Sequence, residues 1–103
     1  EKAMSMKGPR MLIALSPCPP GWDYDPQETV TIGKLAVKTG IWPLKEYVDG
    51  RVIHTKIPTE RKPVEEYLKL QGRYKHLFEP QRNDELIAEI QHRVDDYWSK
   101  VSK

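Results

Sequence analysis

The sequence predicts an α/β fold in the order strand, helix, β-hairpin, helix, helix. A continuous apolar run at residues 11–15 has the pattern of a strand that is covered on both faces. Asp49-Gly50 separates two β-prone runs, which is a strong hairpin signal. Apolar residues recur at helical spacing in the remaining segments. These elements cannot cover both faces of the strand, so we expect the C-terminal portion of a larger α/β unit rather than a complete domain.

The first element is predicted to be the end of a helix. Residues 1–7 run into Gly8-Pro9, a helix stop signal. The segment is too short to nucleate a helix by itself, so we interpret it as the last turns of a longer helix. The strand Met11–Leu15 follows and ends at Ser16-Pro17.

The next helix carries clear end signals. Asp25 is a suitable N-cap, Pro26 suits the first helical position, and Glu28 lies in the first turn. We expect this helix to run to about Lys38, with Gly40 as its stop.

The second half of the chain should hold a hairpin and two helices. Residues 42–48 and 51–55 are the predicted hairpin strands. Pro63 should open a helix that Gly72 breaks or bends. Asn83 should cap a last helix whose apolar residues form one stripe.

Composition excludes several classes of protein. The chain has 103 residues, 38% of them hydrophobic, and a net charge of +2 from 17 basic and 15 acidic side chains. The charges alternate in sign along the chain, so no basic stripe for nucleic acid is expected. No apolar run approaches the ~20 residues of a membrane span. With a single cysteine and no signal peptide, we expect a cytoplasmic protein without internal disulfides.

Cys18, the single cysteine, lies in the proline-rich stretch "ALSPCPPGWDYDP" just after the predicted strand. The simplest interpretation is a small buried side chain, since free cysteine is often buried. A catalytic thiol would need a neighbouring base or cation. A zinc ligand would need spaced Cys or His partners, which the chain lacks. An iron–sulfur ligand is a third functional alternative, favoured weakly by the Cys-Pro dipeptide. Trp22 would then shield the sulfur from water.

Other titratable residues have simpler interpretations. His54, His76 and His92 lack the spacing of a metal site and are predicted to be solvated. The adjacent acidic pairs at 65–66 and 95–96 point about 100° apart on a helix, so neither forms a catalytic dyad.

Three stretches together resemble a known family. These are "GPRMLIALSPCPPGWDYDP", "GKLAVKTGIWPLKEYVDG" and "RKPVEEYLKLQGRYKHL". They are similar to consecutive segments near the C-terminus of the β subunit of 2-oxoacid:ferredoxin oxidoreductases, most closely the pyruvate synthase branch. The resemblance extends from about Gly8 to Leu77 and weakens in the last helix.

The resemblance implies a thiamine-diphosphate-binding α/β domain and an enzyme that also uses Mg²⁺. Such an enzyme decarboxylates a 2-oxoacid, passes the acyl group to coenzyme A and sends electrons to ferredoxin through [4Fe–4S] clusters. In the family, three cysteines earlier in the subunit hold the cluster nearest the thiamine, and the fourth ligand matches Cys18. The implied partners are the other subunits and the rest of the β subunit. The alternative is a small non-enzymatic interaction module with Cys18 buried as a structural residue.

The chain departs from the family pattern in two respects. The Gly-Asp-Gly…Asn thiamine motif and the other three cysteines are absent. We therefore expect this chain to be inactive alone and assign no catalytic residue in it. Residues 1–78 are predicted to belong to the thiamine-binding, iron–sulfur domain of the β subunit, and residues 79–103 to a C-terminal helical extension.

Overall fold

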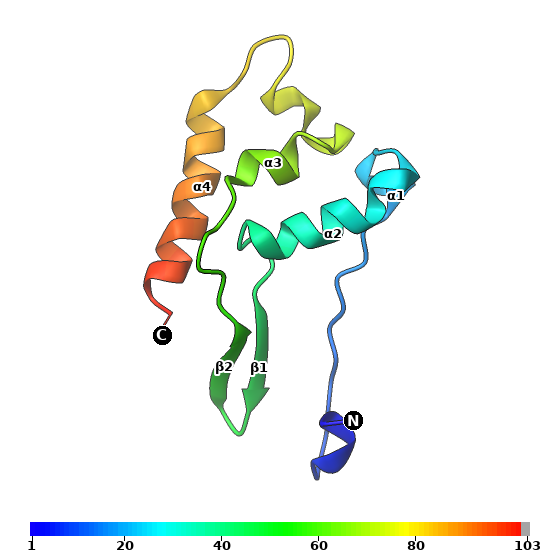
Figure 1. Cartoon of the computed structure of the whole chain (residues 1–103), viewed down its shortest axis with the longest axis vertical. Helices are drawn as coiled ribbons and strands as arrows, with labels where there is room; N and C mark the ends of the chain where they lie inside the picture. Colours follow the sequence, from blue (N-terminus) through cyan, green and yellow to red (C-terminus); the bar gives the residue numbers. More distant parts are fainter. Residues whose placement is uncertain (102–103) are drawn as a thin grey trace.

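The structure, a computed structural model, describes residues 1–101. Its elements follow the order η1 (Ala3–Ser5), α1 (Pro19–Trp22), η2 (Pro26–Glu28), α2 (Thr29–Lys38), β1 (Leu44–Val48), β2 (Arg51–Lys56), α3 (Val64–Leu68), η3 (Gly72–Leu77) and α4 (Asp84–Ser99), where η marks a 3₁₀ helix. Figure 1 shows α1 to α4 toward one end, with the hairpin and the N-terminal segment, which carries η1, extending from them. This is a small α/β unit, as predicted, and the sheet of the described residues has two strands.

Helix α2 begins and ends where its sequence signals predict. The Asp25 carboxylate accepts a hydrogen bond from the Gln27 N–H at 3.0 Å and caps the 3₁₀ turn that leads into α2. At the other end Gly40 adopts a φ of +85°, a left-handed conformation that glycine tolerates best.

The hairpin also forms as predicted. Asp49 and Gly50 have φ values of +50° and +81°, as a tight two-residue turn between right-twisted strands requires. The resulting antiparallel register places Tyr47 opposite Val52 and Lys45 opposite His54.

The predicted helix after Pro63 is divided in two. Helix α3 ends at Leu68, and η3 begins at Gly72, the residue predicted to break it. Helix α4 starts after Asn83, whose side-chain oxygen accepts the Leu86 N–H at 3.1 Å.

The hydrophobic core lies between the helices. Each core residue is at most 9% exposed, and the set comprises Tyr24, Ile32, Ala36, Val64, Tyr67, Leu68, Leu77 and Ile87. At the other end of α4 Trp98 is also buried. The core therefore joins the loop after Cys18 to all the longer helices.

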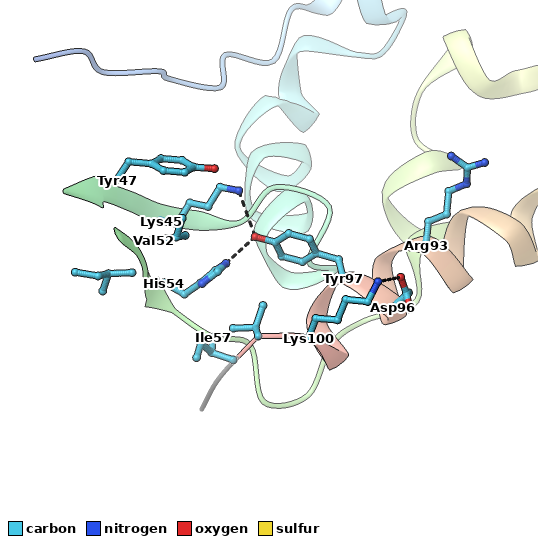
Figure 2. Close-up of a pocket in the computed structure, with 11 residues that line it drawn as sticks. Lys45, Tyr47, Val52, His54, Ile57, Arg93, Asp96, Tyr97 and Lys100 are labelled. Carbon is cyan, nitrogen blue, oxygen red and sulfur yellow. Dashed lines mark hydrogen bonds and ion pairs between the residues drawn. The ribbon is translucent and has the colours of Figure 1, made fainter. Parts of the chain in front are cut away.

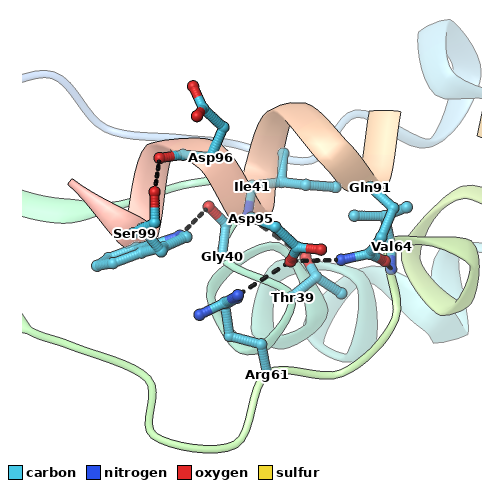
Figure 3. A network of polar contacts seen from close by, with 10 residues as sticks. Thr39, Gly40, Ile41, Arg61, Val64, Gln91, Asp95, Asp96 and Ser99 are labelled. Atoms are coloured by element: carbon cyan, nitrogen blue, oxygen red, sulfur yellow. Dashed lines mark hydrogen bonds and ion pairs between the residues drawn. The ribbon is translucent and has the colours of Figure 1, made fainter. Parts of the chain in front are cut away.

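Polar contacts fix α4 against the rest of the chain (Figure 3). The buried Trp98 indole N–H donates to the Gly40 carbonyl at 2.9 Å. The Arg61 guanidinium donates to Asp95 at 2.9 Å, and Gln91 accepts the Val64 N–H at 2.9 Å.

The division of the chain at residue 78 into a domain and an extension stays a prediction.

The predicted strand Met11–Leu15 is absent from the structure. Residues 11–15 have no regular secondary structure, and Met11, Leu12 and Ile13 are 80%, 85% and 70% exposed. A strand requires a neighbour to pair with its N–H and C=O groups. Within residues 1–101 the only sheet is the hairpin, so this segment runs as an unpaired thread (Figure 1).

The helix ending predicted at residues 1–7 is a single 3₁₀ turn, Ala3–Ser5. The Arg10 guanidinium holds it by donating to the carbonyls of Ala3, Met4 and Met6. No helix among the described residues is both long and apolar enough to cross a membrane.

Candidate functional site

Cys18 lies at the junction between the N-terminal thread and α1. Its backbone is extended (φ −122°, ψ 105°), and its carbonyl accepts the Trp22 N–H at 2.9 Å. Its side chain caps no helix and is exposed to solvent. The alternative of a buried structural cysteine is therefore wrong for this structure, because the core does not cover the thiol. An outside ligand could reach the sulfur.

The loop that carries Cys18 is short and stiff. Pro19 and Pro20 form the first turn of α1, a position that proline favours because its φ is already helical. Gly21 leaves the space beside the sulfur open, since a Cβ placed there would lie 3.7 Å from Cys18 Sγ. Proline-rich sequence alone did not reveal this helical turn.

The far end of the loop is clamped to η3. The Gly72 N–H donates to the Asp23 carbonyl at 2.6 Å, and Asp23 itself has a φ of +59°. A Cβ at Gly72 would lie 2.8 Å from Asp23 Cβ and still closer to its carboxyl group, so only glycine fits. Tyr24 then enters the core. Cys18 is thus five residues from a fixed point of the fold.

Trp22 anchors the loop through its ring. The Arg73 guanidinium carbon lies 3.9 Å from the centre of the Trp22 ring, a cation–π geometry. Arg73 is oriented by bonds to the buried Gln71 (2.6 Å) and to the Tyr67 hydroxyl (3.2 Å). Burial raises the pKa of that Tyr67 phenol, so it stays protonated at neutral pH. The predicted role of Trp22 as a shield over the sulfur stays a prediction.

Within the described residues, Cys18 is not part of a cluster of metal-binding side chains. Among residues 1–101, no three His, Cys, Asp or Glu side chains converge in a way that could hold a metal ion. His76 and His92 are exposed, as predicted. Cys18 could therefore supply one thiolate to a metal centre, and because it is the single cysteine of this sequence, any further thiolate would have to come from outside these residues.

The structure contradicts the prediction that His54 is solvated. It is half-buried, its Nε2 lies 2.6 Å from the Tyr97 hydroxyl, and its ring packs against Trp98 at 5.4 Å between centroids. Lys45 donates to the same hydroxyl at 3.3 Å (Figure 2). The hairpin signal could have placed Lys45 opposite His54. Tyr97 lies 43 residues from His54 in sequence, so only the fold brings it there.

Comparison with known proteins finds similar sequences over nearly the whole chain. Pyruvate synthase subunit PorB of Methanocaldococcus jannaschii is 48% identical over 93% of this chain and 30% of that subunit. PorB of Thermotoga maritima is 42% identical over 98% of this chain and 31% of its own length. Ketoisovalerate oxidoreductase subunit VorB of Pyrococcus abyssi is 38% identical over 100% of this chain and 32% of its own length. No protein-family model matches the chain.

The chain spans about a third of the length of the curated relatives it matches. The fold and the Cys18 loop define its class: a partial α/β unit, with a clamped loop that presents one exposed thiol. The similarity then identifies the family. The chain belongs to the PorB family of oxidoreductase subunits and corresponds to the C-terminal part of that subunit, which confirms the resemblance found in the sequence.

Proposed function

We propose that the chain is part of a 2-oxoacid:ferredoxin oxidoreductase and supplies Cys18 as one ligand of a [4Fe–4S] cluster. The observation that carries the proposal is the 48% identity to a pyruvate synthase subunit, over a range that includes Cys18. The reaction converts pyruvate, or a related 2-oxoacid, and coenzyme A into acyl-CoA and CO₂, and two electrons pass to ferredoxin. The ketoisovalerate oxidoreductase subunit among the relatives supports the broader substrate class.

The surroundings of Cys18 fit the role of a cluster ligand. Iron–sulfur clusters are held by cysteine thiolates at fixed positions. Cys18 has an exposed thiol with no competing hydrogen bond on its side chain. The two prolines and the Gly72–Asp23 clamp limit the movement of its backbone, so little conformational entropy would be lost on binding. A cluster bound here would accept and pass on single electrons.

The remaining cofactors would be bound outside this chain. Thiamine diphosphate with Mg²⁺ supplies carbanion stabilisation when it is bound, and the motif that binds it in the family has no counterpart here. The three missing cluster ligands would come from the rest of the β subunit. The active enzyme would therefore require the other subunits, in a cytoplasmic complex that also binds coenzyme A and ferredoxin.

The proposal is tested by changing Cys18→Ser in the complete oxidoreductase. We expect one cluster signal to be lost or altered in the electron paramagnetic resonance spectrum, the iron content to fall, and ferredoxin reduction to drop. Ser16→Ala is the matched control, because it changes an exposed neighbour and keeps the thiol. An unchanged spectrum together with unchanged ferredoxin reduction would refute the proposal.

A further inference from the structure

A groove separates one face of the hairpin from the C-terminal end of α4 (Figure 2). Its volume is about 860 Å³, and it is open to solvent. Among the described residues, the cations Lys45, Arg93 and Lys100 line it together with one carboxylate, Asp96. The groove is therefore positively charged overall, and it is built from residues other than those of the Cys18 loop.

The three cations differ in how they are paired. Lys100 bonds to Asp96 at 3.0 Å, and Arg93 bonds to Glu89 at 3.0 Å. Lys45 has no carboxylate partner within residues 1–101. Its ammonium group instead lies 5.4 Å from the ring centres of both Tyr47 and Tyr97. Hydrogen bonding to these two tyrosines raises the pKa of Lys45, so the group is charged at neutral pH, and no carboxylate within residues 1–101 neutralises it.

The hairpin beside Lys45 exposes apolar side chains. Tyr47 is 69% exposed, and Val52 and Ile53 are each 47% exposed. Each strand of the hairpin pairs on one side only, so its outer edges offer unpaired backbone groups. Two-stranded hairpins are marginally stable in water and are usually supported by a further strand or surface. The relatives are about three times as long as this chain and could supply one.

We propose that this groove, the Lys45 groove, binds an extended polypeptide segment that carries a carboxylate flanked by apolar side chains, from a part of the oxidoreductase outside these residues. The carboxylate pairs with Lys45, and the apolar side chains cover Tyr47 and Val52. Nucleic acid fits less well, because Lys100 and Arg93 already have acidic partners and a carboxylate lines the groove. The inference rests on the proposed function only for the identity of the complex that supplies this segment.

A zero-length carbodiimide cross-link tests the pairing directly, since it joins a lysine amine to a carboxylate with which it is in contact. The complete oxidoreductase is treated, digested and analysed by mass spectrometry. We expect Lys45 to link to an aspartate or glutamate outside residues 1–103. Lys45→Arg should abolish that product, because arginine keeps the charge but has no reactive amine. Lys75 is the matched control: it lies 3.6 Å from Glu79 and should link only within the chain.

A second variant separates pairing from folding. Lys45→Met removes the charge, while the His54–Tyr97 contact still holds the hairpin to α4. We expect the segment found by cross-linking to detach from the groove about tenfold more often, as measured by amide hydrogen exchange, with the far-ultraviolet circular dichroism unchanged. Tyr47→Ser should weaken the same association without removing the cross-link.

Three outcomes would overturn the inference. The first is the absence of an external cross-link together with unchanged attachment of the segment in the Lys45→Met variant. The others are a cross-link to a second copy of this chain and a cross-linked product that nuclease treatment abolishes. The iron content of the same preparations keeps the two proposals distinct. Normal iron without the cross-link refutes this inference alone. If the Lys45 cross-link forms, but Cys18→Ser leaves the iron content and the spectrum unchanged, only the proposed function is refuted.

Discussion

Gly72→Ala should disrupt the clamp that positions Cys18. A Cβ at residue 72 would lie 2.8 Å from Asp23 Cβ, where ordinary contacts are at least 3.4 Å. Rotation of the Asp23 side chain can move its carboxyl group away, but its Cβ is fixed by the backbone. The backbone of the loop or of η3 must therefore shift, and the hydrogen bond of 2.6 Å from the Gly72 N–H to the Asp23 carbonyl is lengthened or lost.

The expected cost follows from overpacking. Forcing one extra methyl group into a closely packed site typically costs about 1–3 kcal/mol. For a domain of this size, each kcal/mol lowers Tm by roughly 4–8 °C. Near-ultraviolet circular dichroism of the 103-residue chain during heating would measure the change. Gly33→Ala is the control and should raise Tm rather than lower it, because residue 33 lies inside α2 and a Cβ there meets only Pro17 Cγ at 3.7 Å.

A double mutant identifies the mechanism. Asp23→Gly removes the Cβ that collides with the methyl group introduced at residue 72, and glycine also tolerates the φ of +59° at residue 23. We therefore expect Asp23→Gly to restore most of the stability lost in Gly72→Ala. The reasoning is refuted if Gly72→Ala has the same Tm as the wild type, or if the Tm of the double mutant is no higher than that of Gly72→Ala alone. In the complete enzyme, Gly72→Ala should also lower cluster content, because the loop that carries Cys18 moves.

Two further predictions concern the docking of α4. Trp98→Phe leaves the buried Gly40 carbonyl without its donor, and the free energy of unfolding in urea should fall by about 1–3 kcal/mol; an unchanged value would contradict the assigned hydrogen bond. The hydrogen bond from Arg61 holds the pKa of Asp95 below its ordinary value of about 3.9, so this pair stabilises the fold above about pH 4, and the contribution is lost as pH falls through the lowered pKa. Because Asp95 is half-exposed, the effect should stay below about 1 kcal/mol. Asp95→Asn should flatten this part of the curve of Tm against pH, and an equally steep acid loss in that variant would show that another group is responsible.

Features with local causes could be predicted from the sequence. The Asp25 cap, the Asp49-Gly50 turn and the Asn83 cap each depend on a few neighbouring residues, and all three occur in the structure. A break near Gly72 was predicted as well; the helix ends at Leu68 and Gln71 is extended, and the close approach of Asp23 explains why residue 72 itself is glycine. The exposure of Cys18 was not predicted, because burial depends on what the rest of the chain covers.

The strand Met11–Leu15 shows where local reasoning fails. Its apolar pattern describes what its side chains favour, but a strand exists only where another strand satisfies its backbone. The described part of the chain supplies no such partner, so the segment has no regular secondary structure; residues 11–14 are exposed, and only Leu15 packs partly against the core.

The caps that precede α2 and α4, the hairpin turn and the family could all be inferred from the sequence, because these depend on neighbouring residues or on similarity along the chain. Only the tertiary structure decided how the Cys18 loop is clamped and which residues form the Lys45 groove. Gly72 lies 49 residues after Asp23, and Tyr97 lies 52 residues after Lys45. Contacts over such separations arise when the core between the helices packs, and no local pattern encodes them.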